Sequence, residues 1–275
     1  MKKIIVAPDS FKGSLTSAEV ADAVERGIKD VFPQCNVVKA GVADGGEGTV
    51  EAIVKAVGGD MYAASVTDPL GRPVKAAYGI VRSGGVKTAV MEMSAASGLP
   101  LLLPDELNPW ITSTYGTGEM ISDALNRGCR KFLVGIGGSA TNDAGTGMLS
   151  ALGVRFLDSR GQRLKGCGRD LESIARIDMS SLMPAARESE FIVACDVNTP
   201  FCGPDGAARV FAPQKGADPQ TAEALDRGMR SFARVIAEQF QTDIVPLSGA
   251  GAAGGLGGAF KAFLNARLTA GIETV

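Results

Sequence analysis

Histidine is absent from this sequence of 275 residues. Its absence excludes Ser-His-Asp and Cys-His nucleophile systems, and it excludes the metal sites in which imidazole is a ligand. Any acid–base chemistry must therefore come from carboxylates, lysines or tyrosines. Phosphoryl transfer is compatible with that restriction, because its catalysis depends mainly on positioning and on charge stabilisation around the phosphates.

Other absences narrow the class of protein further. The five cysteines are irregularly spaced and form no C-x-x-C pair, so the sequence predicts neither a zinc site nor a disulfide framework. Reduced thiols of this kind are typical of a cytoplasmic protein. No stretch approaches the roughly 18 apolar residues that span a bilayer. The net charge of −2 does not favour a polyanion such as a nucleic acid, which would need a basic face. Neither a membrane nor a nucleic acid is therefore an expected partner.

Short strands and helices alternate in the first part of the chain. Apolar spacing predicts strands at 3–7 and 36–40 and helices at 17–32 and 48–57. Thr16 and Glu19 have the spacing of a capping box at the start of the first helix. This alternation predicts a parallel sheet that is covered by helices on both faces.

The pattern changes near Tyr62, where a second domain is expected to begin. Three strands, at 64–67, 74–81 and 88–93, are separated only by turn signals, which predicts antiparallel neighbours. The strand–helix pattern returns after Thr114. It predicts strands at 131–136 and 191–195 and helices at 117–127, 146–152, 218–240 and 254–268.

Two polar clusters follow the first two strands. Asp9, Ser10, Lys12 and Ser14 come after the first strand, and they predict a site for a small hydroxy acid or a phosphate. A capped turn with a solvated lysine is the alternative. After the second strand, the run Asp44-Gly45-Gly46-Glu47 opens a helix. Its carboxylates are candidates for accepting a substrate proton, although capping of the helix explains them equally well.

A glycine-rich loop follows the predicted strand at 131–136. It carries the polar and flexible residues Gly137, Gly138, Ser139, Thr141, Asn142 and Asp143. Backbone amides and hydroxyls of such a strand–helix turn form an anion cradle, here predicted to contact the phosphates of a nucleotide. The loop is not a Walker A motif, because no G-x-x-x-x-G-K-[ST] occurs in the chain.

A fourth cluster follows the strand at 191–195. Asp196 and Asn198 offer oxygen ligands for Mg²⁺ or for a substrate hydroxyl. An Asx turn at the end of the strand is the alternative.

Taken in order, these clusters resemble the type I glycerate kinase family over essentially the whole chain. The segments that carry the resemblance are APDSFKGSLTSAEVADAVERG from Ala7, ADGGEGTVEA from Ala43, EMSAASGL from Glu92, GIGGSATNDAGTGML from Gly135, VFAPQKGA from Val210 and GAGAAGGLGGA from Gly249. The first of these and the Gly135 segment are highly specific to the family.

The resemblance implies a kinase that uses ATP and Mg²⁺ to phosphorylate D-glycerate, giving 2-phosphoglycerate. It implies two α/β domains: a discontinuous Rossmann-like domain that begins with residues 1–62, and a mixed α/β domain, residues 63–275, inserted into it. The expected catalytic residues are Asp9, Lys12, Asp44 and Asp196, with Asp196 also the metal ligand. A homodimer is compatible with the sequence.

Members of the family continue past the point that corresponds to Val275 with a segment that returns to the first domain. We therefore expect the sheet of the first domain to be short of strands and its apolar edges to be exposed. One alternative function is a catalytically inactive binding protein of the same ancestry. A Rossmann dehydrogenase is disfavoured, because no G-x-G-x-x-G follows the first strand.

Overall fold

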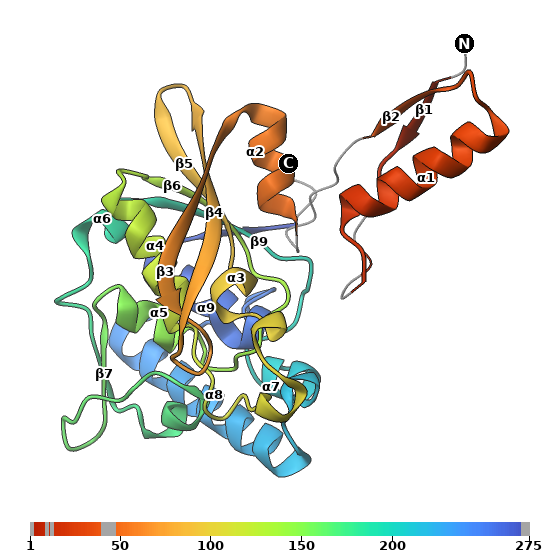
Figure 1. Cartoon of the computed structure of the whole chain (residues 1–275). Helices are drawn as coiled ribbons and strands as arrows, with labels where there is room; N and C mark the ends of the chain where they lie inside the picture. Colours follow the sequence, from red (N-terminus) through yellow and green to blue (C-terminus); the bar gives the residue numbers. More distant parts are fainter. Residues whose placement is uncertain (1–2, 9–10, 12–13, 40–47, 271–275) are drawn as a thin grey trace.

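The computed structural model describes residues 3–8, 11, 14–39 and 48–270 (Figure 1). Its central element is a six-stranded mixed sheet with the order β10-β9-β6-β5-β4-β3. These strands are β3 (Gly59–Thr67), β4 (Pro73–Ser83), β5 (Val86–Glu92), β6 (Lys131–Gly135), β9 (Glu190–Ala194) and β10 (Arg267–Thr269). The chain is thus mixed α/β, as predicted.

The sheet is antiparallel at one end and parallel at the other. β3, β4 and β5 form an antiparallel meander, whereas β5, β6, β9 and β10 run parallel. The prediction of antiparallel neighbours is confirmed, because a short turn can only reverse the chain. The parallel strands are reached through crossovers that contain helices, among them α4 (Tyr115–Asn126), α5 (Thr146–Ala151) and α6 (Pro184–Arg187).

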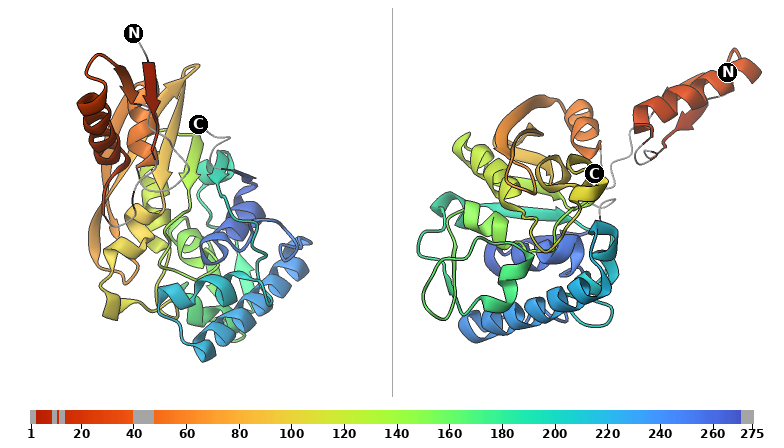
Figure 2. Two further views of the ribbon diagram at one scale, coloured as in Figure 1. Left: turned by 90° about the vertical axis from the view of Figure 1, so that its right-hand side faces the viewer. Right: turned by 60° about the horizontal axis from the view of Figure 1, so that its bottom comes forward.

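One face of the sheet carries the main hydrophobic core. Helix α9 (Ala252–Leu264) lies between β9 and the long helix α8 (Pro219–Phe240) (Figure 2). Aromatic side chains join the three layers. The Phe260 ring lies 5.8 Å from that of Phe191 in β9, and Phe263 stacks on Phe232 in α8 at 6.4 Å. Helix α4 packs on the same face of the sheet, where Tyr78 of β4 donates a hydrogen bond to Asp123.

Helix α2 (Thr49–Val57) covers the opposite face over β4 and β5. Val50, Ile53 and Val54 pack there against Val81 and Val90. The helix therefore contacts the six-stranded sheet, although it precedes the domain boundary that the sequence predicts near Tyr62. That boundary and the two-domain arrangement stay predictions.

The remaining strands form two small sheets. β1 (Lys3–Val6) and β2 (Asn36–Lys39) are parallel neighbours, and helix α1 (Ser17–Val31) lies between them in the sequence. Figure 1 shows these three elements apart from the six-stranded sheet. The predicted capping box is present, with Thr16 and Glu19 bonded to each other's backbone amides. β7 (Arg155–Leu157) and β8 (Arg176–Asp178) form the other small sheet. The short helices α3 (Ser94–Ser97) and α7 (Ala207–Phe211) complete the α-helices and β-strands of the described residues.

The last helix is predicted from the sequence at 254–268, and the prediction of its C-terminal end is wrong. α9 stops at Leu264, and Asn265 adopts a left-handed conformation with φ of 48°. Asparagine tolerates this region, so it ends the helix and lets the chain turn. Residues Arg267–Thr269 then pair with β9 as the edge strand β10. Among the described residues, no helix combines the length and apolar character needed to cross a membrane.

Candidate active site

The carboxyl ends of β6 and β9 bring two predicted loops together. The strands are parallel neighbours, and their last residues, Gly135 and Ala194, are register partners. The loop after β6 and the loop after β9 therefore start at the same edge of the sheet, where open α/β sheets bind ligands. A pocket of about 280 Å³ lies between them, lined by Gly137, Gly138, Ser139, Asp196, Gln214 and Lys215 with apolar neighbours from β6, β9, α7 and α9.

Lys215 is the most unusual residue of this pocket. Its side chain is only 1% exposed, yet it belongs to the pocket lining. The ammonium Nζ donates to Ser139 Oγ at 2.7 Å and to the Thr141 carbonyl at 2.6 Å. Both partners are neutral, so the buried amine is bonded to the glycine-rich loop without an ion pair at this contact.

Burial lowers the pKa of Lys215 to about 7, because desolvation disfavours the charged form. The negative charge of Asp143 works against this shift without reversing it. An anion that enters the pocket would favour the ammonium form, since an opposite charge nearby raises the pKa of a lysine. The pocket is therefore suited to bind anionic groups such as phosphates.

Backbone contacts hold the glycine-rich loop in place. The Leu99 amide donates to the Gly138 carbonyl at 2.9 Å, and the Ala140 amide donates to the Ser97 carbonyl at 3.0 Å. Gly138 has a φ of 71°, a conformation that glycine adopts without strain. Within the described residues, the amides of Gly138 and Ser139 donate to no backbone carbonyl. They remain available as donors to a ligand.

Asp143 lies beneath the pocket and does not line it. The side chain is fully buried and accepts hydrogen bonds from the Thr114 amide at 2.7 Å and hydroxyl at 2.8 Å, and from the amides of Gly145 at 3.0 Å and Gly147 at 3.2 Å. Burial raises the pKa of Asp143, and these donors oppose the shift. The residue connects the start of α4 with the start of α5, which fixes the far end of the loop.

Thr141 and Asn142 are also fully buried and do not line the pocket. The Asn142 amide donates to the Met229 sulfur at 3.3 Å. Two of their atoms, Thr141 Oγ1 and Asn142 Oδ1, have no hydrogen-bond partner within the described part of the chain. The direct phosphate contacts predicted for the loop thus fit Gly137, Gly138 and Ser139, while the geometry gives its last three residues a supporting place.

The structure separates Asn198 from Asp196. Asp196 lines the pocket, whereas the Asn198 Oδ1 atom accepts a hydrogen bond from the Ser248 hydroxyl at 2.8 Å and is not part of the lining. Among the described residues, no group of three acidic or cysteine side chains could hold a metal alone. One carboxylate beside an anion-binding loop nevertheless fits Mg²⁺, which is usually held by one or two carboxylates together with substrate phosphates.

The other predicted site residues belong to the first two clusters. Ser14 lies in the turn before α1, where its amide donates to the Phe11 carbonyl at 2.8 Å. The remaining members, Asp9, Ser10, Lys12, Asp44, Gly45, Gly46 and Glu47, lie outside the described residues. Their expected convergence on a substrate therefore stays a prediction.

Sequence analysis did not single out Lys215 as a site residue. A signal was available, because the Pro213-Gln-Lys-Gly216 turn follows an apolar helix and lies in one of the segments that carry the family resemblance. Nothing in the local pattern indicates that the lysine is buried. That fact depends on the loop after β6, which is distant in the sequence.

Comparisons with known proteins agree on one family. The profile of the "Glycerate kinase family" matches residues 4–275. A glycerate kinase of Haemophilus influenzae is 48% identical over 99% of this chain and 72% of its own length, and a glycerate 2-kinase of Escherichia coli is 47% identical over 99% of this chain and 71% of its own. The crystal structure of a "putative glycerate kinase 2" from Salmonella typhimurium LT2 superposes with a TM-score of 0.87 at 46% identity. The superposition covers 100% of this chain and 73% of the Salmonella chain.

These matches extend over nearly the whole chain and include the loops that form the pocket. The fold, the pocket at the ends of β6 and β9 and the sequence similarity point to the same family of enzymes. The chain belongs to the glycerate kinase family.

Proposed function

We propose that this chain transfers the γ-phosphoryl group of ATP to the 2-hydroxyl of D-glycerate, giving 2-phosphoglycerate and ADP. The observation that carries the proposal is the buried Lys215, which is bonded to Ser139 in an anion-binding pocket at the ends of two parallel strands. Family membership supplies the expected reaction, and the pocket supplies a site for the nucleotide phosphates.

In the proposed arrangement, the phosphates of ATP lie over the glycine-rich loop. The amides of Gly138 and Ser139 donate to phosphate oxygens, and Lys215 contributes a cation from beneath. Because phosphoryl transfer is accelerated mainly by positioning and charge stabilisation, these groups need no covalent role. Asp143 holds the loop from below and keeps its amides oriented.

Asp196 is the residue that would hold Mg²⁺ at this pocket. The metal would neutralise charge on the phosphates while bound there. The exposed position of Asp196 at the pocket lining leaves room for water ligands, which Mg²⁺ usually retains.

The acceptor site is proposed to lie in a first domain that begins with residues 1–62, facing the inserted domain of residues 63–275. β1 and β2 are parallel neighbours, with Val6 paired to Lys39, so the residues that follow them start at one edge of the small sheet. Asp9, Lys12 and Asp44 come from these two loops. Lys12 pairs with the glycerate carboxylate or with the transferring phosphoryl group. Asp44 accepts the proton of the attacking hydroxyl as the hydroxyl oxygen bonds to phosphorus and ADP leaves.

The cytoplasmic setting that this reaction implies is supported by the cysteines. All five are free thiols, and four of them are buried. A reducing compartment preserves that state.

Incubation of the purified chain with D-glycerate and Mg·ATP, followed by phosphorus NMR of the product, tests the proposal. Phosphorus on the 2-oxygen couples to one proton, whereas phosphorus on the 3-oxygen couples to two. We expect the first pattern, with a rate that falls by about 10²-fold in Lys215→Met. A protein that binds ATP but forms no phosphoglycerate would instead support the inactive binding protein, and a 3-phosphate product would contradict the assigned hydroxyl.

A further inference from the structure

A second pocket lies at the opposite end of the six-stranded sheet. Its volume is about 510 Å³, and it is formed where the meander β3-β4-β5 extends past the C-terminal end of α4. We call it the basic pocket; its side chains are Asp60, Tyr62, Ile80, Arg82, Lys87 and Arg127. None of these residues lines the candidate active site.

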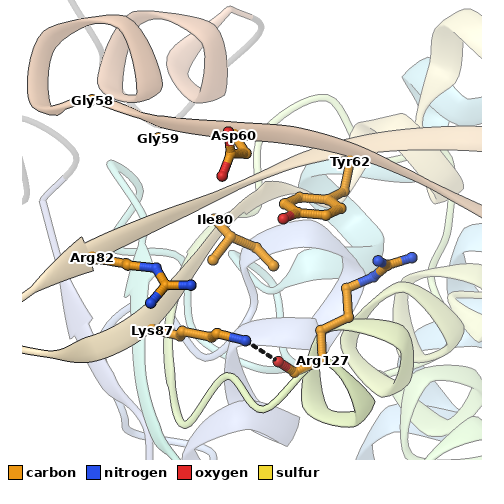
Figure 3. A pocket seen from close by; sticks show the side chains of 8 residues that line it. All are labelled: Gly58, Gly59, Asp60, Tyr62, Ile80, Arg82, Lys87 and Arg127. Carbon is orange, nitrogen blue, oxygen red and sulfur yellow. Dashed lines mark hydrogen bonds between the residues drawn. The ribbon is translucent and has the colours of Figure 1, made fainter.

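The strand register explains why these side chains share one face. Asp60 is paired with Ile80, and Arg82 with Lys87, so each pair projects to the same side of the sheet. Tyr78 lies on this side as well, where it bonds to α4. Figure 3 shows Asp60 projecting from β3 toward the space around Ile80, with Arg82 and Lys87 on one side and Arg127 on the other.

The three cationic side chains of this pocket differ in their ion pairs and hydrogen bonds. Arg127 is paired with Asp123 at 2.8 Å, and its guanidinium carbon lies 4.8 Å from the centroid of the Tyr62 ring. Lys87 Nζ donates to the Arg127 carbonyl at 2.7 Å, a neutral partner (Figure 3). Neither Arg82 nor Lys87 forms an ion pair with a carboxylate in the described part of the chain.

Two unpaired cations thus stand directly opposite each other on adjacent strands. Like charges in such cross-strand positions destabilise a sheet. The Arg127 carbonyl compensates part of the Lys87 charge, whereas Arg82 has no carboxylate within salt-bridge distance in the described part of the chain. An anion between them would remove that cost. Lys87 caps the carbonyl of Arg127 at the negative end of the α4 dipole, where a cation is favourable.

The size and composition of the basic pocket indicate the class of ligand. Its volume is in the range typical of small-molecule sites, which is more than a single ion needs. Arg82 and Lys87 supply donors suited to phosphate oxygens, and the carboxylate of Asp60 can accept from a hydroxyl. A phosphate group attached to a small hydroxylated carbon skeleton satisfies all three.

We infer that the basic pocket binds a phosphate group, free or carried by a small hydroxylated phosphate ester, through Arg82 and Lys87. This binding does not depend on the proposed kinase activity, because the two pockets share no residue. The ester is expected to bind more tightly than inorganic phosphate, since only the ester engages Asp60.

Fluorine NMR of the chain labelled with 3-fluorotyrosine tests the inference directly. The sequence contains three tyrosines, and only Tyr62 lines the basic pocket. Its resonance, assigned with Tyr62→Phe, should move during titration with inorganic phosphate and saturate at a lower concentration with glycerol 3-phosphate. The titrations are run at constant ionic strength with chloride as the reference anion. An unmoved Tyr62 resonance would overturn the inference.

Matched variants establish which residues bind. Arg82→Gln should raise the dissociation constant by about three- to tenfold, as expected for the loss of one exposed charged partner. Arg160→Gln, which removes an exposed arginine from the turn after β7, should leave it unchanged. Equal dissociation constants in the two variants would refute the assignment to Arg82. The rate of glycerate phosphorylation without added phosphate should be the same in both.

Discussion

Replacement of Lys215 by methionine would test whether its amine is buried as the structure shows. Lysine in the unfolded chain has a pKa near 10.5, whereas burial lowers the pKa of Lys215 to about 7 in the folded protein. Between these values the unfolded state binds more protons than the folded state. The free energy of unfolding should therefore rise with pH in this window, and methionine should abolish that contribution.

The magnitude follows from the size of the shift. A difference of about 3.5 pH units at 1.36 kcal/mol per unit corresponds to about 5 kcal/mol over the whole window. From pH 7 to pH 9, the wild-type chain should gain about 2 kcal/mol relative to Lys215→Met. Other titrating groups are common to both proteins, so their contributions cancel in this difference.

Urea unfolding at pH 7, 8 and 9 would measure the effect. Lys261→Met is a suitable control, because Lys261 is an exposed lysine of α9 and should give a difference that is flat with pH. The wild type and Lys215→Met also differ by the hydrogen bonds of Lys215 to Ser139 and Thr141. To a first approximation, the loss of these bonds changes the free energy of unfolding by the same amount at every pH. A flat difference for Lys215→Met would refute a desolvated amine at this position.

Four further changes probe the fold and the candidate active site. Asp143→Asn should lower the free energy of unfolding by about 1–3 kcal/mol in chemical denaturation, because donors bond to both carboxylate oxygens and the asparagine nitrogen that replaces one of them cannot accept; an unchanged stability would contradict its supporting role. Gly79→Ala should cost about 1–3 kcal/mol, since a Cβ there would lie 2.2 Å from Val54 Cγ2. Gly27→Ala in α1 should instead raise the melting temperature, because the added Cβ would meet no described atom within 4 Å beyond its chain neighbours and the backbone of its own helix. Ser139→Ala should lower the rate of glycerate phosphorylation, and the circular dichroism spectrum of the variant should match that of the wild type. Full activity of the variant would exclude a role for the Ser139 hydroxyl.

Much of the local structure could be predicted from the sequence, because it depends on neighbours along the chain. The capping box at Thr16 is confirmed, and the meander follows from turn signals with no helix between the strands. The end of α9 shows the limit of this reasoning. Apolar residues recur at intervals through Leu268, but Asn265 turns the chain and the edge of β9 pairs with the next residues as a strand. Periodicity alone does not reveal that an edge is available.

For the candidate site too, some features could be predicted from the sequence and others could not. A polar loop after a predicted strand was sufficient to select Ser139 and Asp196 as candidate site residues, because open parallel sheets bind ligands at the carboxyl ends of their strands. The chain alone did not show that Asp143 turns inward to hold two helices, or that Lys215 reaches beneath the loop. Burial of a charged side chain is decided by the elements that pack around it. The sequence therefore determined which groups reach the site, and the tertiary structure decided which of them face a ligand and which support the others.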